Sequence, residues 1–113
     1  MKIAKIKVPI FGSWLVLVNY KKPEERDKFC DDININHNGS ESFCYYKHDE
    51  RAIYICLQLD EPIAVVAHEA LHATNFILAD VGADHNRDDD EVPAYLLKWI
   101  MEQIKDAKYK DYK

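Results

Sequence analysis

The sequence predicts a single α+β domain in which a small antiparallel sheet of about four strands packs on two long helices. Up to residue 60, the apolar residues lie in short alternating or β-branched runs that are typical of strands. Beyond residue 60, two longer segments have helical spacing. The length of 113 residues suits one domain over residues 1–113. The expected order, β-β-α-β-β-α-α, segregates strands from helices late in the chain, as α+β proteins do.

The first strands are expected to form a hairpin. Residues 2–8 alternate between apolar and lysine side chains, and residues 14–20 are rich in β-branched and aromatic residues. Gly12 supplies a turn between them. A short helix is predicted over residues 23–31, because Pro23 suits a first helical turn and acidic residues follow it.

Two further strands are predicted over residues 42–48 and 52–59, on either side of a polar turn. In the second of these strands, every other side chain from Ile53 to Leu59 is apolar. We expect that face of the strand to contact the core.

The C-terminal half is expected to consist of two helices. The first covers residues 62–79, with Asp60 as its N-cap and Gly82 as its stop, and it is apolar all round, which is typical of a buried helix. The second covers residues 90–107, and residues 108–113 are expected to fray. Apolar residues at helical spacing mark its inner face: Val92, Leu96, Trp99, Ile100 and Ile104.

Composition and charge exclude several classes of protein. The chain has 15 basic and 20 acidic residues, a net charge of −5, which argues against general nucleic-acid binding. We identify no signal peptide and no membrane span, so we expect a cytoplasmic protein without a membrane partner. The three cysteines, Cys30, Cys44 and Cys56, form no CxxC pair and are expected to be small buried hydrophobes.

One motif carries chemistry, the HExxH pattern of His68, Glu69 and His72. Residues four apart lie one above the other on a helix, so both imidazoles are able to bind one zinc ion. Glu69 is rotated by about 100° from His68, where it is placed to act as a general base on a water rather than as a ligand. The alternative is a pair of core histidines bonded to their neighbours, but such buried polar groups are costly to leave unpaired.

A third ligand has to come from outside the motif. The loop and helix start that follow offer five candidates: His85, Asp88, Asp89, Asp90 and Glu91. Reach alone does not discriminate among them. If the second helix packs Leu96 and Ile100 on the first, position 91 or 92 belongs to its inner face, and Val92 is apolar. Glu91 is then the inward carboxylate.

The spacing of 18 residues between His72 and Glu91, with Glu91 opening an ExxA pattern, resembles the gluzincin metallopeptidases. With Tyr95, Leu96 and Leu97 after it, the ExxA pattern also resembles the short anti-repressor peptidases of the ImmA/IrrE type, and the chain is closest in size to minimal gluzincin-like proteins of phages and mobile elements. The resemblance covers residues 52 to about 104. Departures from the pattern are a shorter gap than in the ImmA/IrrE type, Thr74 at a position that is usually hydrophobic, and no large substrate-binding domain.

The resemblance implies a role for each of these residues. His68, His72 and Glu91 would bind Zn²⁺, Glu69 would be the general base, and residues 52–59 would be the edge strand that holds an extended peptide. Tyr95 and His85 are candidates for stabilising the transition state.

The implied function is a zinc metallopeptidase acting on an extended protein or peptide substrate, in the host cytoplasm if a phage encodes the chain. The alternative is a non-catalytic zinc-containing phage protein that binds a host factor. A third hypothesis, a metal-dependent hydrolase of nucleic acid, conflicts with the net negative charge.

Overall fold

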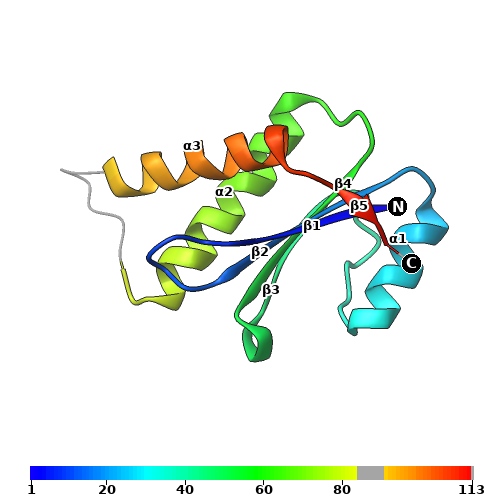
Figure 1. Cartoon of the computed structure of the whole chain (residues 1–113). Coiled ribbons are helices and arrows are strands. Elements are labelled where there is room, and N and C mark those ends of the chain that lie inside the picture. The colour runs from blue at the N-terminus through cyan, green and yellow to red at the C-terminus, as the bar shows by residue number, and fades with distance from the viewer. Residues whose placement is uncertain (84–90, 113) are drawn as a thin grey trace.

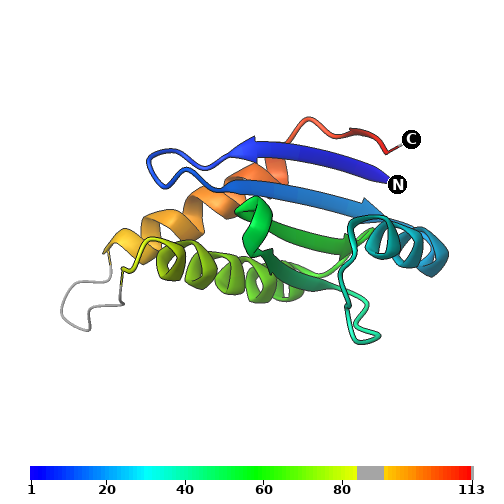
Figure 2. The ribbon, with the colours of Figure 1, turned by 90° about the horizontal axis from the view of Figure 1, so that it is seen from below.

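A five-stranded sheet with helices on both faces forms the fold, as a computed structural model of residues 1–83 and 91–112 shows (Figures 1 and 2). The fold class is therefore α+β, as predicted. The strands are β1 (Lys2–Lys7), β2 (Trp14–Tyr20), β3 (Phe43–Lys47), β4 (Ala52–Gln58) and β5 (Lys110–Asp111). The helices are α1 (Pro23–Ile33), α2 (Ile63–Asp80) and α3 (Glu91–Asp106), with a 3₁₀ turn at His48–Glu50.

The strands lie in the order β3-β4-β2-β1-β5. The predicted hairpin of β1 and β2 is confirmed, with Lys7 opposite Trp14. The expectation of a wholly antiparallel sheet is wrong at one pair, because β2 and β4 run parallel. The chain between them crosses over through α1 and β3, which is the kind of long connection that a parallel pair requires. The predicted fraying of the C-terminus is also wrong, since β5 pairs with β1 at Lys2 and Ile3.

Strand β4 lies in the middle of the sheet, not at its edge. The predicted core face of Ile53, Ile55 and Leu57 packs in the cluster that contains α2 and α3 residues. The opposite face is buried as well, because Tyr54 and Cys56 pack with α1 residues. Leu59, which follows the strand, is exposed, contrary to the prediction. Strand β3 lies next to β4 at one end of the strand order. It is therefore the edge strand that contacts α2.

Helix α2 is one-sided rather than buried all round. Its inner face includes Ala70, Ala73 and Ile77, none of which is exposed, whereas Ile63 and Leu71 lie at the surface. The predicted N-cap at Asp60 is wrong, because the helix begins after Pro62. Its end at Gly82 is confirmed by a Schellman arrangement, in which the Gly82 and Ala83 amides donate to the Ala79 and Leu78 carbonyls.

The buried Thr74 hydroxyl donates to the Ala70 carbonyl over 2.9 Å. This bond explains how a polar residue is accommodated in the core side of α2.

Helix α3 packs against α2 through Leu96 and Ile100, which are buried in the same cluster. Val92 was expected on this inner face but is 56% exposed, and Tyr95 is 65% exposed. The first turn of α3 therefore lies outside the core. No helix in the described part of the chain has the length and apolar character needed to cross a membrane.

One polar network joins the end of α2 to the turns of the sheet. Arg51 donates through Nη2 to the Asp80 carboxylate over 2.6 Å and to the Phe11 carbonyl over 3.1 Å. The Tyr46 hydroxyl donates to the second oxygen of Asp80. These bonds hold the pKa of Asp80 below its usual value. Asp80 thus fixes α2 against both neighbouring turns.

We predict that Asp80→Asn lowers the free energy of unfolding by about 1–2 kcal/mol, because charged hydrogen bonds to a mostly buried carboxylate are lost. The folded pKa of Asp80 is depressed, so its contribution is complete above the unfolded pKa and is lost as the pH falls through the folded pKa. Urea denaturation at pH 7 and pH 3 measures both effects. Asp49→Asn is the control, since the Asp49 carboxylate is exposed and its ion pair with Lys47 should contribute much less to stability.

Candidate metal centre

The HExxH motif lies within α2, in which His68 and His72 are the sixth and tenth of 18 residues. The Nε2 atoms of His68 and His72 are 3.2 Å apart, and their ring centroids are 4.8 Å apart. Both imidazoles are exposed, so a ligand has access to them. The two side chains that the helical spacing predicts to converge are therefore brought together.

This arrangement fits a zinc ion. Two nitrogen ligands at about 2.0–2.1 Å from a tetrahedral zinc lie about 3.3 Å from one another. The observed separation of 3.2 Å agrees with that value without any movement of the helix. The two nitrogens also lie within hydrogen-bonding distance of each other.

Glu69 has a different environment from the two histidines. Its side chain is 8% exposed against 68% for His68, and its Oε1 lies 3.8 Å from His68 Nε2. Burial raises the pKa of Glu69, while His68 and His72 oppose that shift. A carboxyl group whose pKa is raised toward neutrality is better matched to general-base catalysis than an ordinary one. Glu69 is thus held beside the pair and shielded from solvent.

A pocket of about 340 Å³ opens at the motif, between α2 and the start of the edge strand β3. Along with the three motif residues, it is lined by Ser40, Ser42, Phe43, Cys44 and Phe76. The predicted cleft strand, residues 52–59, does not contribute to this lining. That prediction is wrong for a topological reason: β3 is inserted at the edge beyond β4. Residues of β3 and of the segment before it therefore form the wall opposite the motif.

Cys44 also lines this pocket, whereas its apolar surroundings in the sequence predicted only a small buried hydrophobe. Burial raises the pKa of its thiol, and the neighbouring Glu69 raises it further. Cys44 and Tyr46 are two residues apart on a predicted strand, so both side chains are expected on the same face of the sheet. That face is the one covered by α2 and α3.

The third ligand is not assembled in the structure. Among the described residues, no group of three or more His, Cys, Asp or Glu side chains lies close enough to hold a metal. Glu91 is exposed in the first turn of α3, and α3 contributes no described residue to the pocket lining. Tyr95 likewise lies outside that lining. His85 and residues 88–90 lie outside the described residues.

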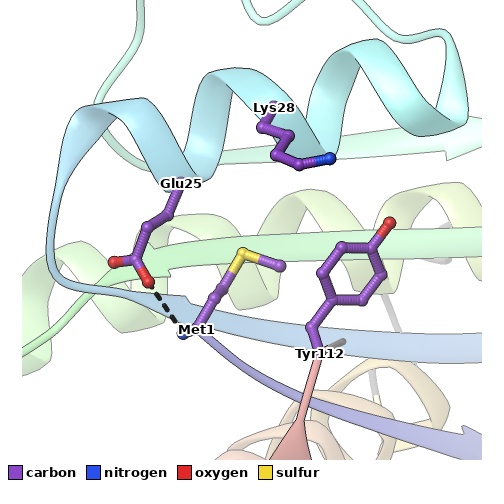
Figure 3. Close-up of a pocket in the computed structure, with 4 residues that line it drawn as sticks. All are labelled: Met1, Glu25, Lys28 and Tyr112. Atoms are coloured by element: carbon purple, nitrogen blue, oxygen red, sulfur yellow. Dashed lines mark hydrogen bonds and ion pairs between the residues drawn. The ribbon is translucent and has the colours of Figure 1, made fainter.

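A different pocket, of about 220 Å³, lies where the two ends of the described chain meet α1 (Figure 3). It is lined by Met1, Glu25, Lys28 and Tyr112. Glu25 accepts from the Met1 ammonium over 2.8 Å, and this bond with two backbone amides lowers the pKa of Glu25 to about 2. The Glu25 carboxylate is therefore ionised and paired with the Met1 ammonium, and no histidine or cysteine is among the described residues that line the pocket. It offers no comparable chemistry.

No protein-family model matches the chain, and neither a curated protein nor a solved structure matches it. The function is therefore argued from the site itself.

Proposed function

We propose that the protein is a zinc-dependent metallopeptidase that hydrolyses a peptide bond in an extended segment of a protein. The observation that carries the proposal is the 3.2 Å convergence of the His68 and His72 Nε2 atoms beside the shielded carboxylate of Glu69. A purely structural zinc site closes with four protein ligands and requires no general base. The presence of Glu69 in the pocket favours catalysis over a non-catalytic zinc protein.

The residues have separate tasks in this proposal. His68 and His72 hold the zinc, which when bound supplies a Lewis acid that polarises a carbonyl and lowers the pKa of water. Glu69 takes the proton of the attacking water and delivers it to the leaving amine. Its burial matters because a shielded carboxylate interacts more strongly with a nearby proton donor than a solvated one does.

The edge strand β3 supplies a binding surface for the substrate backbone. Among the described residues it pairs with β4 on one side only, and it forms one end of the sheet order. An extended peptide can add to such an edge by main-chain hydrogen bonds. Because β3 also lines the pocket of the motif, a peptide that pairs with it passes close to Glu69.

Metal removal tests this proposal directly. We predict that the zinc-loaded protein hydrolyses an unstructured protein such as casein, that dialysis against a chelator abolishes the hydrolysis, and that one equivalent of zinc restores it. Appearance of new amino termini is the measurement. A zinc-loaded protein that cleaves no unstructured substrate over a broad panel would contradict the proposal and favour the non-catalytic alternative.

Glu91 is our proposed third ligand, following the resemblance to gluzincins. The structure does not group Glu91 with the histidines, so binding of zinc would require the start of α3 to approach them. We predict that Glu91→Ala weakens zinc affinity about 10-fold or more, whereas Glu102→Ala on the same helix changes it little. Competition with a chromophoric chelator measures both. If His85→Ala weakens the affinity and Glu91→Ala leaves it intact, the site has three histidines.

A further inference from the structure

A second pocket continues the pocket of the motif along the groove between β3 and α2. Its volume is about 460 Å³. Tyr46 and His48 line it from the side of the edge strand, and Phe76, Ala79 and Asp80 line it from α2. Phe76 lines both pockets, so the two pockets are adjacent. A chain bound in the first pocket that continues along β3 toward His48 reaches the second pocket.

The walls of this second pocket are aromatic. The Tyr46 ring centroid lies 4.2 Å from that of His48 and 5.8 Å from that of Phe76. The carboxylate in the lining, Asp80, is already bonded to Arg51 and to the Tyr46 hydroxyl. Asp80 therefore positions the Tyr46 ring and does not present an unpaired charge to a cationic ligand. The lining suits a large aromatic side chain.

The two pockets have a spacing that an extended peptide can span. Cys44 and Tyr46 are two residues apart on β3, which corresponds to about 7 Å along the strand. Asp80 follows His72 by two helical turns, or about 12 Å along α2. An extended peptide advances about 3.3 Å per residue, so separations of about 7 Å and about 12 Å correspond to about two to four residues of substrate.

We propose that the pocket formed by Tyr46, His48 and Phe76 is a specificity subsite for an aromatic side chain of the substrate. That side chain lies about two to four residues from the hydrolysed bond. The inference rests on the proposed peptidase function, since it places the subsite relative to Glu69. It defines the substrate class as extended segments that carry an aromatic residue at this one position.

The test uses peptide binding to the zinc-loaded Glu69→Gln variant, which is expected to bind peptides without hydrolysing them. Fluorescein-labelled peptides that differ only by Phe or Gly at successive positions are compared by anisotropy. We expect Phe at one position to lower the Kd about 10-fold, or about 1.4 kcal/mol. In the Glu69→Gln/Ala79→Trp variant the new indole fills the pocket, and the preference should drop to about 2-fold or less.

Ala79 is exposed at the rim of the pocket, so the added tryptophan should leave the fold intact. Glu69→Gln/Glu102→Trp adds an equally large side chain on the exposed side of α3 and should retain the preference. Peptides that bind without positional preference, that fail to bind, or whose preference survives Ala79→Trp would each overturn the subsite.

Hydrolysis of the same peptides by the wild-type protein separates the two proposals. Cleavage that is indifferent to the aromatic residue would leave the peptidase intact and overturn the subsite. Preferential binding without any cleavage would overturn the peptidase and leave an aromatic peptide-binding pocket.

Discussion

Glu69→Gln is expected to abolish peptide hydrolysis while leaving zinc bound. Glutamine has nearly the size of glutamate but cannot accept the proton of the attacking water, and loss of a general base costs about 10²- to 10⁴-fold in rate. The histidines that hold the metal are unchanged, so zinc affinity should stay within about 3-fold of wild type. Steady-state kcat/KM and a zinc titration of the same preparation measure the two effects.

Glu24→Gln is the matched control, because Glu24 is exposed on α1, which packs on the opposite face of the sheet from α2. It should change neither quantity. Equal hydrolysis by wild type and Glu69→Gln would show that Glu69 is not the base. If both proteins are inert but bind zinc, the non-catalytic zinc protein becomes the better hypothesis.

The second large effect is expected at the metal ligands. His68→Ala and His72→Ala should each weaken zinc binding by about 100-fold or more, since each removes one of the ligands that the helix pre-positions. Both side chains are exposed, so the metal-free variants should unfold at nearly the wild-type temperature. At a free zinc concentration of 100 times the wild-type Kd, zinc should stabilise the wild type by about 2.7 kcal/mol and each variant by about 0.4 kcal/mol or less.

Thermal unfolding with and without zinc measures this difference. His48→Ala, which removes an exposed histidine outside the motif, should retain the full stabilisation by zinc. A stabilisation that persists in both motif variants would place the zinc elsewhere in the chain.

Local patterns predicted the elements that local contacts determine. The alternation of residues 2–8 and the β-branched run of residues 14–20 lie in β1 and β2, which pair as expected. The helical spacing of His68 and His72 predicted their convergence, because side chains four apart on a helix are neighbours in any context. The burial of Glu69 follows from its rotation toward the sheet, although only the packed structure shows its extent.

Long-range pairing was beyond the sequence patterns. The pattern of strand β4 predicts one buried face, yet both faces are buried, because α2 and α3 cover one side of the sheet and α1 covers the other. The choice of β3 as the edge strand depends on a crossover that no local pattern encodes. The pocket residues Ser40 and Ser42 were missed for the same reason, since they meet α2 only through the position of β3.

The inner face of α3 was also mispredicted at its start. Val92 was placed inside by extrapolating the helical period from Leu96, but the buried contacts of α3 are at Leu96 and Ile100 and do not extend to Val92. The sequence argument for Glu91 as an inward carboxylate depended on that extrapolation. The proposal that Glu91 binds zinc therefore rests on the resemblance to gluzincins. The zinc affinity of the Glu91→Ala variant tests it.

X-ray absorption at the zinc edge, on protein loaded with one equivalent of zinc, tests the central claim most directly. We predict two imidazole nitrogens at about 2.0–2.1 Å from the ion, which are lost in the His68→Ala/His72→Ala variant. The remaining ligands should be oxygen at about 2.0–2.2 Å if Glu91 binds, whereas a sulfur at about 2.3 Å would identify a cysteine instead. A protein that takes up no zinc, or binds it without imidazole ligands, would contradict the assignment of the metal site to His68 and His72.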